Sequence, residues 1–226
     1  MNDLEPGLAS LRTWSQVARG AIGVFLLIML LLVAAYVVIL FTELTRERTG
    51  TSLLNPVFAY VLVGTNLLLA GFFLIAAVPI AGWIYRAHAN LREAGAVELR
   101  YSPGWSVGSF LVPLVNFVVP FRAMRELHNR SHGEGPWQAE SPVPDVTSWW
   151  SCHIAAVVIS GVPLMIALIS TIPGFYVLQP PGVNTGLVLF SLLLLTGSAV
   201  FLFRTIGAVT RAQRDRQHLN HADVFA

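Results

Sequence analysis

The side chains with the greatest capacity for chemistry gather in one stretch of the chain, between Trp83 and Glu126. Arg86 and Asn90 are four residues apart, so they share one face of a helix. Glu126 closes the stretch, and its carboxylate is expected to contact Arg86, either directly or through a water molecule. Two interpretations remain open. Either these residues clamp an unusual backbone turn, or they line a pocket for an anionic group or another ligand.

Two histidines follow directly. His128 and His132 have the i, i+4 spacing that can hold a metal or a haem, and Glu126 is close by. Ser131 and Gly133 indicate that the helix is already ending there, so the two histidines are weak metal candidates and we expect neither a metal nor a cofactor. No nucleophile elbow, phosphate loop, HExxH motif or carboxylate pair occurs in the sequence, so nothing in it argues for an enzyme.

The elements that must position these residues are apolar. Hydrophobic residues make up 55% of the 226 residues and charged residues only 12%, whereas soluble domains carry about 25% charge. The apolar residues form continuous runs, and about 20 helical residues cross a bilayer. The sequence therefore predicts an all-α membrane protein, a single membrane domain over residues 1–226 with four transmembrane helices. The predicted spans cover residues 20–42, 57–84, 151–177 and 184–204.

A fifth apolar stretch, residues 105–121, is interrupted by Gly108, Pro113, Asn116 and Pro120. Proline removes a backbone donor and breaks a helix. If this stretch does not cross the membrane, 12 of the 14 arginines lie on one side; if it crosses, the better orientation gives 9. Because arginine is enriched in cytoplasmic loops, we predict a re-entrant or interfacial segment that begins and ends on the cytoplasmic side.

The same distribution predicts the orientation. Both termini, the loop 122–148 and the tail 205–226 are expected in the cytoplasm, and only Arg46 and Arg48 outside. All basic residues are arginine, which suggests a bacterial genome rich in GC, and hence a bacterial plasma membrane. The small net charge of +2 and the absence of like-charge runs argue against nucleic acid as a partner.

Irregular backbone at membrane depth requires partners in the protein. The broken segment is therefore expected to pack among the four helices, with residues 113–116 deepest and the Asn116 amide bonding carbonyls freed by the break. Aromatic residues suggest belts at the membrane boundaries. They are Trp83, Tyr85, Tyr101 and Trp105 near one end of this segment, and Trp149 and Trp150 at the start of the third span.

Three motifs occur in order: W-x-x-R-x-x-x-N (residues 83–90), P-x-W-x-V (103–107) and P-x-x-N-x-x-x-P-x-x-x-M-x-E (113–126). Their order resembles a bacterial multi-pass membrane family that is catalogued only as a domain of unknown function. The resemblance implies a topology and no activity. The candidate site residues are Trp83, Arg86, Asn90, Trp105, Pro113, Asn116, Pro120, Arg122 and Glu126.

Three functions remain open. The first is a non-enzymatic scaffold, sensor or partner subunit that contacts the lipid bilayer and other membrane proteins or a second copy of itself. The second is a small transporter or channel-like protein with residues 105–121 as its selectivity element. The third is a membrane enzyme that holds a lipid headgroup with Arg86 and with Arg122 or Arg125.

Overall fold

Four long helices make up the protein in a computed structural model that describes residues 4–49, 56–96, 98–169, 172–174 and 180–215. They are α1 (Leu4–Thr49), α2 (Pro56–Glu93), α5 (Pro144–Ile169) and α6 (Val183–Asp215). Each is long and apolar enough to cross a membrane, which confirms the predicted all-α class with four candidate spans. Residues 170–171 and 175–177 of the third predicted span, and 216–226 of the predicted tail, lie outside the described residues.

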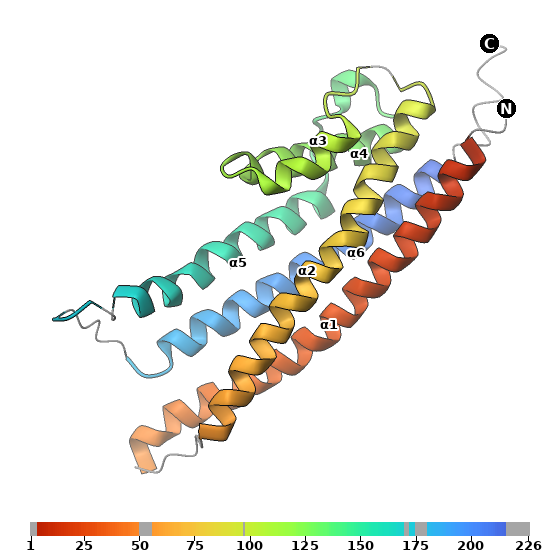
Figure 1. Ribbon diagram of the computed structural model, residues 1–226. Coiled ribbons are helices and arrows are strands. Elements are labelled where there is room, and N and C mark those ends of the chain that lie inside the picture. Colours follow the sequence, from red (N-terminus) through yellow and green to blue (C-terminus); the bar gives the residue numbers. More distant parts are fainter. Residues whose placement is uncertain (1–3, 50–55, 97, 170–171, 175–179, 216–226) are drawn as a thin grey trace.

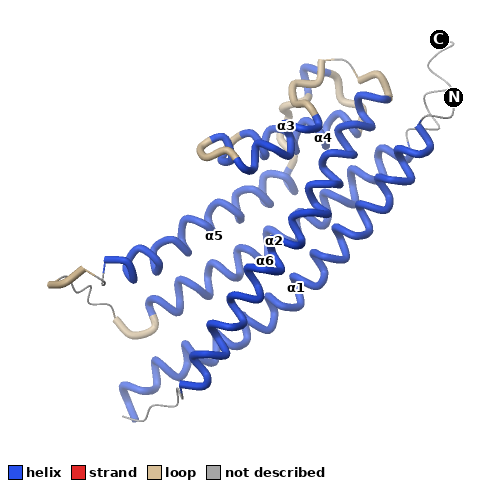
Figure 2. The backbone as a smooth tube through the Cα atoms, in the orientation of Figure 1, coloured by secondary structure: helices blue, strands red, loops and turns tan. Residues whose placement is uncertain are grey.

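The helices lie side by side in an elongated bundle (Figures 1 and 2). Helix α6 packs against both α1 and α5, and α2 packs against α1. Helices α1 and α5 begin, and α2 and α6 end, at the same end of the bundle (Figure 1), which we call the polar end. Large apolar side chains from all four helices and from α4 fill the core. They include Met29, Leu32, Trp83, Ile84, Met124, Leu127, Val146, Leu192, Ile206 and Val209.

The segment between the second and third spans turns back on itself. It consists of α3 (Pro103–Gly108), two short 3₁₀ turns (Ser109–Leu111 and Val115–Phe117) and α4 (Val119–Ser131). Both of its ends lie at the polar end of the bundle (Figure 1). The segment therefore does not cross, and the predicted break between these spans is confirmed.

The turn of this segment is a γ-turn centred on Leu114. The Val115 N–H donates to the Pro113 carbonyl over 2.8 Å, and Leu114 has φ +66° and ψ −45°. A γ-turn of this hand is rare and strained for a residue with a side chain. The predicted turning point within residues 113–116 agrees with this geometry.

The expectation that the whole segment is packed among the four helices is wrong for its tip. Helix α3 packs against α2, and α4 packs against α2, α5 and α6, but Leu111 and Leu114 are 86% and 80% exposed. The reason is local hydrogen bonding: the backbone N–H groups of residues 115–118 each find a carbonyl within the turn, so these donors need no partner on the neighbouring helices. Asn116 takes part through its backbone N–H, which donates to the Val112 carbonyl.

The predicted aromatic belts are also largely wrong. Trp83 is completely buried, and Tyr101, Trp149 and Trp150 are buried as well. Only Tyr85 and Trp105 keep about half of their surface exposed. A buried tryptophan needs a partner for its indole N–H, and Trp83 finds one inside the bundle, donating to the Thr210 hydroxyl over 3.0 Å.

Candidate functional site

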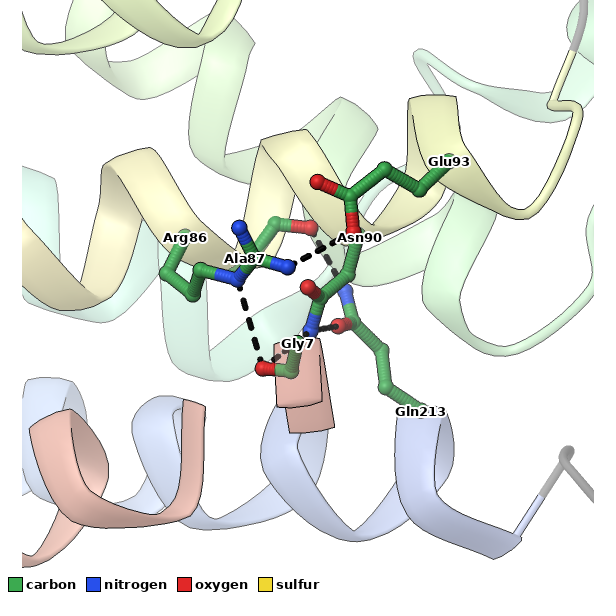
Figure 3. Close-up of polar contacts among 6 residues, drawn as sticks. All are labelled: Gly7, Arg86, Ala87, Asn90, Glu93 and Gln213. Carbon is green, nitrogen blue, oxygen red and sulfur yellow. Dashed lines mark hydrogen bonds and ion pairs between the residues drawn. The ribbon is translucent and has the colours of Figure 1, made fainter. Parts of the chain in front are cut away.

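Buried amide side chains connect three helices at the polar end (Figure 3). Gln213, near the end of α6, donates through Nε2 to the Ala87 carbonyl of α2 over 3.0 Å. The same nitrogen donates to the Ser131 hydroxyl of α4, which the figure does not draw, over 2.8 Å. Gln213 Oε1 accepts from Asn90 Nδ2 over 3.4 Å. Gln213 and Asn90 are both buried. Because an unpaired amide in such a place is costly, these bonds fix α2, α4 and α6 relative to one another.

Arg86 extends this network to α1 (Figure 3). Its Nε donates to the Gly7 carbonyl over 3.3 Å, and its Nη2 lies 2.6 Å from Glu93 Oε2. A Cβ on Gly7 would lie 2.2 Å from Arg86 Nη2, so any larger residue at this position would displace the Arg86 side chain from its present place. Arg86 thus has partners on α1 and on its own helix.

Glu126 of α4 closes the base of the broken segment. It is 3% exposed, and its two carboxylate oxygens accept from the backbone N–H groups of Arg100 and Tyr101 over 2.7 and 3.2 Å. Burial raises the pKa of Glu126, and the two backbone hydrogen bonds oppose that rise. The expected pair between Arg86 and Glu126 is therefore wrong: charge complementarity suggested it, but backbone amides satisfy the carboxylate.

Two further side chains hold the ends of this region. The Asn129 amide nitrogen lies 3.0, 3.1 and 3.0 Å from the carbonyl oxygens of Gln138, Ala139 and Ser141, to which it donates. Trp150 of α5 donates its indole N–H to the Phe117 carbonyl over 3.0 Å. Asn129 thus fixes the loop before α5, and Trp150 fixes the returning arm of the segment.

The nine candidate residues do not converge on one point. Trp83, Asn90, Pro120 and Glu126 are buried, Arg86 and Asn116 are partly buried, and Trp105, Pro113 and Arg122 are exposed. The buried members serve different contacts, since Arg86 and Asn90 meet α1 and α6 whereas Glu126 meets the start of the segment. The arrangement can fix backbone positions, and it presents Trp105 and Arg122 to the surroundings.

The sequence interpretation missed Gln213 and Asn129. Gln213 continues the buried stripe of α6 formed by Leu202, Ile206 and Val209, and a polar residue at the end of such a stripe signals a buried amide. For Asn129 we find no comparable signal, because its three acceptors are backbone carbonyls of a loop.

The two histidines of α4 stack on each other. The ring centroids of His128 and His132 are 4.1 Å apart, and His132 Nδ1 lies 2.7 Å from the His128 carbonyl oxygen. Burial and the charge of His132 lower the pKa of His128. Within the described part of the chain, no three His, Cys, Asp or Glu side chains converge as metal ligands would.

Residues 57–217 match the model of a family described as "Domain of unknown function (DUF4328)". The match covers α2, except for its first residue, through α6 and every candidate residue, and it leaves the whole of α1 outside. No curated protein and no solved structure matches the chain.

Proposed function

Because the chain belongs to the DUF4328 family, whose description carries no activity, we propose its role from its own geometry. The protein acts as a non-enzymatic membrane scaffold or partner subunit that presents its broken segment to another membrane protein in the plane of the bilayer. The observation that carries this proposal is a contrast within the broken segment. Hydrogen bonds from Glu126 and Trp150 hold its base, where the chain enters and leaves the segment. Its tip, around Leu111 and Leu114, is apolar and exposed.

The base supports a fixed presentation. Glu126 binds the backbone where the segment begins, and Trp150 binds it where the segment returns. Both bonds use buried or partly buried side chains, so they restrict how far the segment can swing. A surface that is held in place loses less conformational entropy on binding, which favours association.

The tip supports an apolar partner. Exposed apolar side chains follow one another along it. They are Trp105 (45%), Leu111 (86%), Leu114 (80%), Phe117 (50%) and Val118 (45%). A contiguous exposed apolar patch is typical of an interaction site. In a bilayer such a patch suits both acyl chains and the apolar face of a neighbouring helix.

The other two hypotheses receive less support. A selectivity element would line a path through the bundle, whereas this tip faces outward. A membrane enzyme that holds a lipid headgroup with Arg86 would need this side chain free, whereas Arg86 is engaged by Gly7 and Glu93.

We place both termini and the loop 122–148 in the cytoplasm of a bacterial plasma membrane, on the strength of the arginine distribution. Cysteine labelling of intact cells tests this orientation. In a Cys152→Ser background, Glu134→Cys should resist a membrane-impermeant maleimide until the cells are opened. Labelling from outside would reverse the orientation.

Affinity purification in mild detergent tests the scaffold role. The wild type should retain one or more membrane proteins that the double variant Leu111→Ser/Leu114→Ser loses. The matched control is Leu30→Ser/Leu31→Ser in α1, where the leucines are also exposed (64% and 71%) and where retention should persist. Identical retention by all three proteins, or equal loss in both variants, would contradict the proposal.

A further inference from the structure

Two arginines from different helices converge beside Gly207 of α6. A Cβ placed on Gly207 would lie 3.2 Å from Arg211 Nη1 and 3.7 Å from Arg19 Cζ. Arg19 belongs to α1 and Arg211 to α6, so the two guanidinium groups meet where these helices pack. The missing side chain of Gly207 leaves the space into which both reach.

Arg19 is held in position. Its Cζ lies 4.1 Å from the centroid of the Phe203 ring, a cation–π contact. Its Nε is buried and has no hydrogen-bond partner within the described residues. The guanidinium is therefore oriented by packing, and part of its donor capacity remains unused.

The charge of this pair is not balanced nearby. Both guanidinium groups lie within 4 Å of the same point, the Cβ position of Gly207, so their positive charges repel each other. Four arginines of the described chain form ion pairs with carboxylates, and neither Arg19 nor Arg211 is among them. Arg204, on the preceding turn of α6, provides the contrast, since its Nε lies 3.3 Å from Asp145 Oδ2. Two converging arginines without a carboxylate in the described chain form a site suited to an anion.

The position along the helices suggests which anion. Arg19 directly precedes the uncharged run that begins at Gly20, and Arg211 follows the apolar part of α6. Both therefore lie where a spanning helix leaves the hydrocarbon, at the level of lipid headgroups. Guanidinium groups bind phosphate oxygens through paired N–H donors.

We propose that Arg19 and Arg211 bind the phosphate of an anionic phospholipid beside Gly207. The site is distinct from the broken segment, and it does not depend on the scaffold role. Phe203 orients one guanidinium, and the missing side chain at Gly207 lets both guanidinium groups lie against α6 at one point.

Lipid binding to the purified full-length chain in detergent micelles tests the proposal, with native mass spectrometry as the readout. Phosphatidylglycerol should bind more tightly than phosphatidylcholine. Arg19→Gln and Arg211→Gln should each weaken phosphatidylglycerol binding on the order of tenfold, because each removes charge-assisted hydrogen bonds. Gly207→Leu should weaken it similarly with both charges kept.

Matched controls separate the site from general effects. Arg214→Gln removes an arginine of the same helix that has its own acidic neighbour, Asp215, and Gly186→Leu fills a position where a Cβ meets nothing within 4 Å. Both should bind as the wild type does. Melting temperatures show whether each variant is folded; if Arg19→Gln is not, exposed Arg211 still provides the test.

Three results would overturn the proposal. The first is equal binding of phosphatidylglycerol by the wild type and the folded arginine variants, and the second is no preference over phosphatidylcholine. The third concerns the source of the phosphate. Inorganic phosphate alone is titrated into the protein and its binding is measured by calorimetry. Binding of inorganic phosphate that requires Arg19 and Arg211, with no binding of phosphatidylglycerol, would show that the ligand is not a lipid.

Discussion

The polar end of the bundle and the rest of its length are held together by different interactions. At the polar end, side-chain hydrogen bonds join distant parts of the chain, as between Gln213 and Ala87 or between Trp83 and Thr210. Elsewhere in the described helices, hydroxyl groups bond to carbonyls three or four residues earlier in their own helix. These are Thr42, Thr45, Ser160, Ser191 and Thr196.

The difference follows from the solvent. Lipid is as apolar as a leucine side chain, so burying leucine between helices provides little driving force in a bilayer, and close packing contributes to joining the apolar lengths. Hydrogen bonds across helices are specific in distance and direction. The polar end therefore fixes the register of the helices and the position of the broken segment, and substitutions there should cost more than substitutions elsewhere.

The largest effect is expected at Glu126. Glu126→Ala leaves the buried N–H of Tyr101 and the partly buried N–H of Arg100 without acceptors, and should lower the free energy of unfolding by about 2–4 kcal/mol. Reversible unfolding in mixed micelles measures this. Glu140→Ala is the control, because Glu140 forms an exposed pair with the Arg100 side chain and should contribute about 0–1 kcal/mol.

A double-variant cycle tests the corrected partners of Glu126. Since Arg86 and Glu126 contact different groups, the effects of Arg86→Ala and Glu126→Ala should add within about 0.5 kcal/mol. A larger coupling energy would indicate a direct interaction between Arg86 and Glu126, as their opposite charges suggest.

A smaller loss is expected at Gln213. Gln213→Ala removes bonds to α2 and α4 and should cost about 1–3 kcal/mol. Thr196→Ala, in the apolar part of the same helix, removes only a bond to the Leu192 carbonyl and should change stability by less than about 0.5 kcal/mol. Equal losses of stability in the two variants would contradict the distinction between the polar end and the rest of the bundle.

The pH dependence of stability gives a third comparison. Burial raises the pKa of Glu126 above its ordinary 4.5, so the folded protein keeps a proton that the unfolded chain has lost. The stabilisation from this proton is complete below pH 4.5 and disappears as the pH rises through the raised value. The stability of the wild type relative to Glu126→Gln should therefore increase as the pH falls through this window. Parallel stability curves would contradict the assignment.

The smallest effect is expected at the tip. Leu114→Gly relieves the positive φ, worth about 1–2 kcal/mol, and adds about 0.5–1 kcal/mol of backbone entropy cost, so a net gain of roughly 0–1.5 kcal/mol is expected. Leu111→Gly is the control: Leu111 is equally exposed, and it has no positive φ to relieve. It should lose about 0.5–1 kcal/mol. Losses of the same size at both positions would argue against the γ-turn.

The sequence predicts the helices and the break because those signals are local. Uncharged runs of sufficient length indicate spans, and the close spacing of Gly108, Pro113 and Pro120 indicates a broken helix. A single proline is a weaker signal, since Pro79 and Pro163 lie inside continuous helices. The partners of Glu126 and Trp83 cannot be obtained in this way. Pairing by charge ignores backbone N–H donors, and the Thr210 hydroxyl that accepts from Trp83 is 127 residues away. Burial of these two residues depends on how the helices pack against one another, and the periodicity of the sequence does not reveal that packing.

Amide hydrogen exchange measured by NMR in micelles tests the central claim most directly, namely that buried polar side chains fix the backbone of the broken segment. The amides of Arg100 and Tyr101 lie outside any helix, and their acceptor is the Glu126 carboxylate. They should exchange slowly in the wild type and rapidly in Glu126→Ala, while amides within α6 keep their protection. Rapid exchange of both amides in the wild type would contradict the account.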